Sequence, residues 1–184
     1  MQSLTEYFRE EQQFRQSWIW LIIGSSLLAL IPLWYGVYQQ LVLGIPWGDD
    51  PASDGMLVLV VAGMTLLIGS LLYLFRISRL FVSLDSEGVK YRFTPFHRRI
   101  HAIPWTEVNK AFVRTYRPII EYGGWGIRYG LKGRAYNVSG NEGLQLELKS
   151  GRRVLFGTKE PDRLAVVLAQ IPGVPQGPRQ EERG

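Results

Sequence analysis

The feature that most constrains this chain is an uncharged apolar segment at residues 56–75, MLVLVVAGMTLLIGSLLYLF. A helix rises about 1.5 Å per residue, so this segment would form a rod of about 30 Å, which matches the hydrocarbon core of a bilayer. Lipid offers the backbone no hydrogen-bond partners, and an isolated segment can therefore cross it only as a helix. Arg76 and Arg79 follow at once and indicate a cytoplasmic end.

A second uncharged segment, WIWLIIGSSLLALIPLWYGVY, occupies residues 18–38 and predicts another span. A secretory signal is excluded because the segment is long, follows an acidic stretch and precedes no small-residue cleavage site. The loop at residues 39–55 contains three aspartates and neither lysine nor arginine, as expected on the non-cytoplasmic side. Residues 17–76 are therefore predicted to form a transmembrane hairpin with both chain termini in the cytoplasm.

Small residues on both spans predict how the hairpin packs, because they allow two helices to approach closely. These residues are Ser25, Ala29 and Gly36 on the first span and Gly55, Ala62 and Gly69 on the second. The same faces could instead receive the helices of a partner. Neither span contains an Asp, Glu, Lys, Arg or His side chain, so no ion or proton pathway is expected.

The N-terminal residues 1–16 are predicted to be a cytoplasmic amphipathic lead-in, with a short surface helix at residues 3–16. Ser3 and Glu6 have the spacing of a capping box, which satisfies free backbone N–H groups at a helix start. The expected stripe on this helix is only modestly apolar.

Beyond Arg79 the hydrophobic pattern changes to a period of two, which is typical of half-buried strands. Residues 77–171 are predicted to form a mainly-β domain of about seven antiparallel strands, as a small barrel or sandwich. The predicted strands include residues 80–84, 89–94, 98–103 and 109–117. Gly88 is expected to adopt a left-handed conformation in a hairpin turn, and residues 104–108 are expected to form one helical turn.

One amphipathic helix is predicted to close this domain. It begins at Pro161, ends at Pro172-Gly173, and carries Leu164 and Leu168 on one stripe. A helix this short needs tertiary contacts, so its apolar stripe should cover an open side of the β domain. Residues 172–184 are rich in proline, glycine and charge, and are predicted to be a flexible tail.

Composition excludes some chemistry and indicates a cationic domain. The chain has no cysteine, which rules out disulfides, thiolate metal sites and cysteine nucleophiles. Residues 76–184 contain 19 Lys and Arg against 10 Asp and Glu, a net charge of +9 within a total of +5. Such charge either attracts anionic lipid, at about 1 kcal/mol per near-surface cation, or only follows the positive-inside bias.

Several stretches carry a family resemblance: VSLDSEGVKYRF, PFHRRIHAIPWTEV, EYGGWGIRYGLKGRAYNVSGNEGLQLEL and GTKEP. Short strands followed by one C-terminal helix resemble a pleckstrin-homology-like (PH-like) domain. From about residue 14 to 171 the chain is similar to a family of bacterial two-span membrane proteins with such a domain. The resemblance implies a PH-like fold and a place in the bacterial cytoplasmic (inner) membrane. It implies no activity.

The glycine-rich segment EYGGWG provides a first candidate site. Glycines around an aromatic residue permit unusual backbone conformations and close approach by another chain. One interpretation is an exposed contact for a partner, and the other is a bulge that seats Trp125 in the core. The candidate contact residues are Tyr122, Gly123, Gly124, Trp125 and Gly126.

Cations near the predicted membrane surface provide a second candidate site, for anionic lipid. They are Arg76, Arg79, Lys90, Arg92, Arg98 and Arg99. The acidic, tight turn at residues 85–88 argues against a specific headgroup pocket there. His97 and His101 are expected on one strand face, but no third ligand accompanies them, so neither a metal site nor acid–base catalysis is predicted.

These patterns together predict a non-enzymatic membrane-anchored adaptor that binds a protein or anionic lipid at the cytoplasmic face. The alternative is an accessory subunit of a larger membrane complex, and a remote alternative is an enzyme whose site goes unrecognised. No catalytic residue, cofactor or metal is predicted. Nucleic acid is not an expected partner, because no recognition helix accompanies the arginines.

Overall fold

The computed structural model describes residues 6–130 and 133–178. The chain divides into two compact units: a helical unit, Arg15–Arg76, and a β unit that combines Met1–Phe14 with Ile77–Gly184. The helical unit is thus inserted into the sequence of the β unit. The chain therefore contains two long apolar helices together with a mainly-β region of two sheets and a C-terminal helix.

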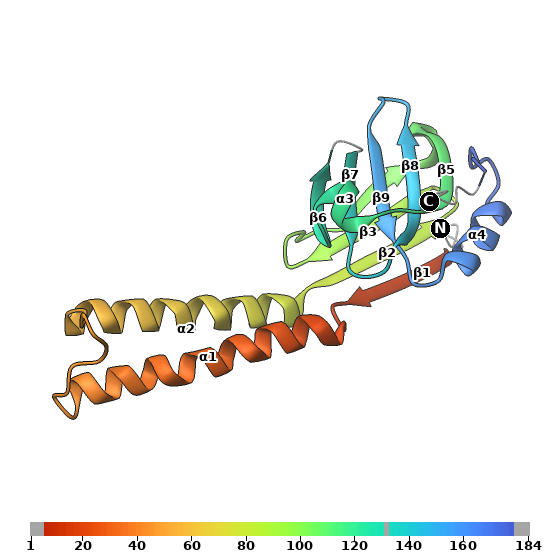
Figure 1. The fold of residues 1–184 in the computed structure, drawn as a ribbon. Coiled ribbons are helices and arrows are strands. Elements are labelled where there is room, and N and C mark those ends of the chain that lie inside the picture. The colour runs from red at the N-terminus through yellow and green to blue at the C-terminus, as the bar shows by residue number, and fades with distance from the viewer. Residues whose placement is uncertain (1–5, 131–132, 179–184) are drawn as a thin grey trace. The chain divides into compact units, whose positions relative to one another are not determined.

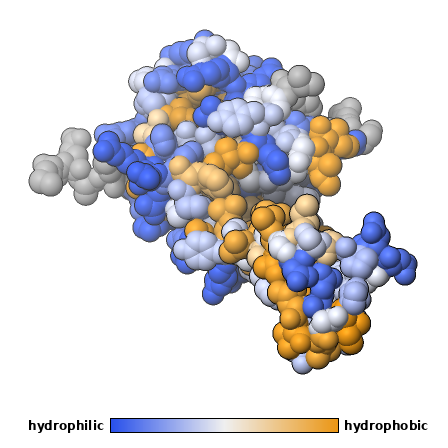
Figure 2. Space-filling model, turned by 90° about the vertical axis from the view of Figure 1, so that its left-hand side faces the viewer, coloured by the Kyte–Doolittle hydropathy of each residue, from blue (hydrophilic) through white to orange (hydrophobic). Residues whose placement is uncertain are grey.

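The helical unit consists of α1 (Ser17–Leu41) and α2 (Asp54–Ile77), joined by a loop (Figure 1). Both predicted helices are confirmed, and each is long and apolar enough to cross a membrane. Figure 2 shows hydrophobic side chains over the outer surface of this hairpin. Such a surface suits lipid, because the transfer of apolar side chains from water into hydrocarbon is favourable.

Large side chains, rather than small ones, pack the hairpin near its loop. Val37 of α1 contacts Leu57 and Val61 of α2, and the indole N–H of Trp34 donates a 3.0 Å hydrogen bond to Thr65 Oγ1.

The predicted small-residue interface between the spans is wrong. Of the six residues only Gly36 is buried, and it is covered by the Trp47 ring of the loop rather than by α2. Ala62 is half-buried, and the other four residues are exposed; these are Ser25, Ala29, Gly55 and Gly69. The aliphatic side chains that fill the interface leave no need for a glycine or serine contact there.

The N-terminal segment is a strand, β1 (Glu6–Gln13), so the predicted surface helix is wrong; residues 3–5 of that helix lie outside the described residues. Alternate residues from Phe8 to Phe14 are buried, including Glu10 and Gln12. Glu10 accepts hydrogen bonds from Thr158 Oγ1 (2.6 Å) and the Lys159 N–H (2.8 Å). A period of two was present, but polar residues at two inward positions concealed the strand.

The β unit contains two sheets. The first has the order β1-β2-β3-β4, with β2 (Arg79–Asp85), β3 (Gly88–Thr94) and β4 (His101–Pro104), all antiparallel. One turn of 3₁₀ helix, η1 (Trp105–Glu107), follows β4 and confirms the predicted helical turn.

The second sheet has the order β5-β8-β9-β7-β6. Its strands are β5 (Val108–Thr115), β6 (Gly126–Gly130), β7 (Gly133–Asn137), β8 (Glu142–Leu148) and β9 (Arg153–Gly157). β7 and β9 pair in parallel, so the prediction of purely antiparallel strands is wrong for this pair. A short helix, α3 (Pro118–Tyr122), precedes β6 and was not predicted.

Aromatic residues connect the two sheets in the core. Tyr91 of β3 lies 4.9 Å from Tyr136 of β7 and 4.8 Å from Phe156 of β9, between ring centroids. The predicted alternation along β3 is confirmed, because Val89, Tyr91 and Phe93 are all buried. Gly88 at the start of β3 is not left-handed. It is required because a Cβ there would collide with the Ile103 carbonyl oxygen on β4.

The predicted C-terminal helix is α4 (Pro161–Gln170), and its contacts confirm that it covers the sheets. Leu164 and Leu168 are buried, and the helix contacts β1, β5 and β8. The following residues are ordered along β5, since the Ala111 N–H donates to the Pro175 carbonyl (2.8 Å). The prediction of a flexible tail did not anticipate this pairing with β5, and residues 179–184 lie outside the described residues.

Candidate functional site

A cleft of about 600 Å³ opens in the β unit between the two sheets. It is lined on one side by β3 and β4, through Tyr91 and Ile103, and on the other by β6, β7 and β9. β4 and β6 are the edge strands of their sheets within the part of the chain that the structure describes. Residues of two edge strands thus line the same cleft, and an edge strand has backbone N–H and C=O groups that its own sheet does not pair.

Arginine dominates the charge of this cleft. Its described lining contains three arginines, Arg134, Arg152 and Arg153, against a single acid, Glu107. The Arg134 guanidinium lies over the Tyr129 ring, 4.5 Å from its centroid, and donates a 3.1 Å hydrogen bond to the Tyr136 hydroxyl. That hydrogen bond raises the pKa of Arg134 above its ordinary value. The guanidinium is therefore a fixed positive charge.

The other two arginines are less restrained. Arg153 pairs with Glu147 at 3.2 Å, and Arg152 Nε donates to Ser150 Oγ at 3.2 Å. Burial and a hydrogen bond with Tyr136 raise the pKa of Tyr91, so its hydroxyl stays neutral at physiological pH. The cleft is suited to an anionic group, because its three arginines face two carboxylates, Glu107 in the lining and Glu147 beside Arg153, and a surplus of one positive charge remains.

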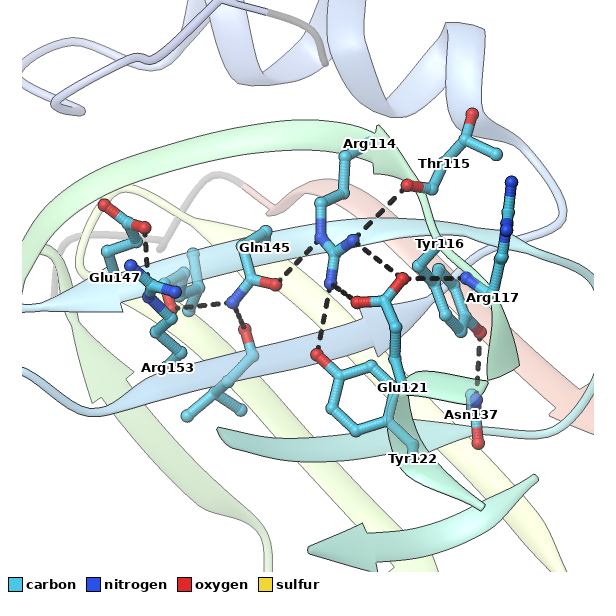
Figure 3. Close-up of polar contacts among 12 residues, drawn as sticks. Arg114, Thr115, Tyr116, Arg117, Glu121, Tyr122, Asn137, Gln145, Glu147 and Arg153 are labelled. Atoms are coloured by element: carbon cyan, nitrogen blue, oxygen red, sulfur yellow. Dashed lines mark hydrogen bonds and ion pairs between the residues drawn. The ribbon is translucent and has the colours of Figure 1, made fainter. Parts of the chain in front are cut away.

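A second arginine cluster, at α3, is closed (Figure 3). Arg114 of β5 pairs with Glu121 at 2.8 Å, and its guanidinium also donates to Gln145 Oε1 and the Tyr122 hydroxyl. Glu121 also accepts the Arg117 N–H at 2.8 Å. Burial opposes the charge of Arg114, but the Glu121 carboxylate outweighs it and raises the pKa of Arg114.

The Arg114 cluster holds α3 against β5 and β8 and offers no open group to a ligand. Sequence reasoning missed both the cluster and the helix. Pro118 at the first helical position and Gly123 after the last were the available signals, since they mark helix ends.

The glycine-rich candidate site is divided by the structure. Tyr122 is buried in a core cluster with Tyr116, Ala135 and Leu155, so its prediction as an exposed contact is wrong. Trp125 is half-buried, and its indole N–H donates to the Gly140 carbonyl at 3.1 Å. The alternative, a bulge that seats Trp125 in the core, is therefore met only in part.

The glycines of this segment serve the backbone. Gly123, Gly124 and Gly126 have φ values of 73°, 119° and 112°, which favour glycine. The Gly126 N–H donates to Asn137 Oδ1 at 3.0 Å. The φ values and this hydrogen bond define the turn between α3 and β6. The glycines are therefore explained by the backbone conformation of the turn.

The predicted cationic residues do not form one site. Arg76 belongs to the helical unit, and Arg79 pairs with Glu11 at 3.1 Å. Lys90 pairs with Asp85 at 2.6 Å, so it is not a free cation for lipid. Hydrogen bonding to Asp85 raises the pKa of Lys90. The remaining three arginines are exposed on β3 and the following turn; these are Arg92, Arg98 and Arg99.

The two histidines contact each other but do not share a strand. His97 lies in the turn after β3, and its ring centroid is 4.5 Å from that of His101 on β4. Its Nδ1 accepts the Phe93 N–H at 3.2 Å. Burial lowers the pKa of His97, and the charges of His101 and Arg134 lower it further. Among the described residues no group of three His, Cys, Asp or Glu side chains is placed to hold a metal.

Comparison with known proteins finds no family model and no curated protein that matches this chain.

Proposed function

We propose that this protein is a non-enzymatic adaptor, anchored in a bacterial cytoplasmic membrane by the α1–α2 hairpin, that binds an extended acidic segment of a partner protein. The observation that carries the proposal is the cleft between edge strands β4 and β6, with three arginines against one acid in its described lining. An extended segment can add to a strand edge through its backbone, while its carboxylates pair with the arginines.

Strand pairing supports the orientation in this proposal. β1 precedes the hairpin and β2 follows it, yet the two strands are antiparallel neighbours in one sheet. If both helices cross the membrane, the two segments that flank them lie on the same side. The positive charge that follows α2, beginning with Arg76 and Arg79, favours the cytoplasmic side.

The PH-like assignment stays part of the proposal. Two sheets and a C-terminal helix that contacts both of them agree with such a domain. Two features depart from the simple strand order expected. One is strand β1, which precedes the two helices, and the other is the parallel pairing of β7 with β9.

Peptide binding to the full-length protein in mild detergent tests the adaptor function. We expect an extended Asp/Glu-rich peptide to bind, and a neutral peptide of the same length to bind far more weakly. Arg152→Glu combined with Arg153→Glu should weaken binding by about tenfold or more, which corresponds to about 1.4 kcal/mol.

Lys159→Glu combined with Arg163→Glu is the matched control for this experiment, since it also reverses two exposed cations and both lie outside the cleft lining. Binding should also weaken with salt, because exposed charges are screened. Equal binding of acidic and neutral peptides, or an equal effect of the Lys159→Glu and Arg163→Glu control, would contradict the proposal.

A second candidate function, an accessory subunit of a larger membrane complex, is favoured by one observation. Four of the predicted small residues are exposed on the hairpin instead of packing within it, and small exposed residues suit contact with other membrane helices. Purification in mild detergent separates the candidates. A stoichiometric complex that is lost in Gly69→Leu favours the subunit, whereas a monomer that binds acidic peptide favours the adaptor.

A further inference from the structure

The turn between β3 and β4, residues 95–100, combines exposed apolar and cationic side chains. Phe96 is 58% exposed and Ile100 is 53% exposed. Arg98 and Arg99 lie between them and are also exposed. The Phe96 ring contacts Phe93 at 6.0 Å between centroids, yet more than half of the surface of Phe96 and of Ile100 faces water beside two positive charges.

The register of the first sheet places this turn at the end where the chain departs for the apolar helices. Arg79, the first residue of β2, pairs with Gln13 at the end of β1 and with Thr94 at the end of β3. Gln13 precedes α1 by four positions, and Arg79 follows α2 by two. Only residues 14–16 separate β1 from α1, and only Ser78 separates α2 from β2, so the chain leaves for both helices from this end of the sheet.

The opposite end of the same strands has the opposite character. The β2–β3 turn contains Ser86 and Glu87, both exposed, next to Asp85, which is held by Lys90. It offers no apolar side chain and no unpaired cation. The first sheet is therefore polarised, with an apolar cationic end beside the tethers and an acidic end away from them.

Internal hydrogen bonds hold the β3–β4 turn in shape. The His97 N–H donates to the Phe93 carbonyl at 2.8 Å, and the Phe93 N–H donates to His97 Nδ1. The His97 ring packs against Tyr91 and Tyr136, at centroid distances of 5.8 and 5.5 Å. With His97 turned inward, its neighbours Phe96 and Arg98 are presented outward on a fixed backbone.

We propose that the β3–β4 turn is an interfacial anchor, which inserts Phe96 and Ile100 between the headgroups of an anionic bilayer while Arg98 and Arg99 bind lipid phosphates. Charge complementarity and the short tethers select the bilayer surface as the occupant. The proposal rests on the membrane-anchoring part of the proposed function and is independent of the arginine cleft.

Single-cysteine labelling tests this proposal, because the natural chain contains no cysteine. Full-length Phe96→Cys, Ile100→Cys, Ser86→Cys and Leu66→Cys are each spin-labelled in nanodiscs, with or without phosphatidylglycerol. Accessibility to oxygen reports lipid, and accessibility to a water-soluble nickel chelate reports solvent. Ser86 is the control at the acidic end of the sheet, and Leu66, which is 71% exposed on α2, reports the membrane span itself.

We expect the oxygen-to-nickel ratio at positions 96 and 100 to exceed that at position 86 severalfold in phosphatidylglycerol discs. Arg98→Glu with Arg99→Glu, in the Phe96→Cys background, should abolish most of that difference. A label at 96 as water-exposed as the label at 86, while 66 reports lipid, overturns the anchor alone. Exclusion of both reagents from 96 overturns it in favour of a protein contact.

Two further results would also overturn the anchor proposal or part of it. A water-exposed label at 66 overturns membrane anchoring and the turn proposal together. Equal immersion of 96 in discs without phosphatidylglycerol, unchanged by the two arginine substitutions, overturns the recognition of anionic lipid.

Discussion

The two arginine clusters of the β unit differ in how their charges are compensated. The Arg114 guanidinium is almost buried and meets a carboxylate, an amide and a hydroxyl. The cleft arginines face an open space of about 600 Å³, and Glu107 is the single acid in its described lining. The comparison teaches that abundance of arginine does not indicate a binding site. What distinguishes the cleft is positive charge that the fold leaves available.

The largest expected effect comes from breaking the closed cluster. Glu121→Gln leaves the charge of Arg114 buried and uncompensated, so the free energy of unfolding should fall by about 3–5 kcal/mol, measured by denaturant unfolding of the full-length protein. The matched control is Glu147→Gln, which removes the acid paired with the 55% exposed Arg153 side chain and should cost less than about 1 kcal/mol.

A double variant sharpens this result. Arg114→Met with Glu121→Leu removes both charges and should recover much of the stability lost in Glu121→Gln, because no buried charge then remains unpaired. If Glu121→Gln were no more harmful than Glu147→Gln, the contrast between closed and open clusters would be wrong.

A smaller effect is expected from Tyr122→Phe. This substitution removes the hydroxyl that accepts a 3.2 Å hydrogen bond from Arg114 while Glu121 remains in place. The free energy of unfolding should fall by about 1 kcal/mol. Tyr129→Phe is the control, since Tyr129 is 72% exposed and its hydroxyl should contribute little. A loss as large as that of Glu121→Gln would show that the hydroxyl contributes as much to the cluster as the carboxylate does.

The β3–β4 turn extends the comparison to a partly buried titratable group. His97 has its pKa lowered from 6.5, chiefly by burial, so the unfolded chain binds the proton more tightly. Stability should therefore be highest above about pH 6.5 and should fall as the pH falls through the lowered pKa. His97→Asn keeps an acceptor for the Phe93 N–H but cannot titrate, and thermal unfolding of this variant should depend less on pH in that window. An unchanged pH dependence would assign the effect to other groups.

The smallest effect on stability is expected in the cleft. Arg152→Ala should change the free energy of unfolding by less than about 0.5 kcal/mol, because the side chain is exposed and its hydrogen bond goes to the nearby Ser150. The same substitution should weaken binding of the acidic peptide severalfold, measured by fluorescence anisotropy. A variant that lost stability without losing affinity would place Arg152 with the structural arginines.

Elements with local signals were predictable from the sequence. Uncharged segments of membrane length gave both helices, and the alternation of Val89, Tyr91 and Phe93 gave β3. The C-terminal helix followed from Pro161 and the stripe that contains Leu164 and Leu168. In each case the determining residues lie within one or two turns of each other, so period and composition are sufficient.

The candidate site was not predictable in the same way. The sequence shows many arginines, but only the fold brings β7 and β9 opposite β4 and encloses a cleft between them. It also buries Tyr122, which the segment EYGGWG alone offered as one possible surface contact. Burial depends on which segments meet, and that information is spread over the whole chain.

The sequence by itself determined that two helices of membrane length interrupt a cationic, β-rich chain, because length, charge and period are local properties. Only the tertiary structure decided that residues 6–13 form a strand, since Glu10 and Gln12 are stabilised at buried positions by partners near Gly157 and Thr158. Those partners lie more than 140 positions away in the sequence, and no local pattern records them.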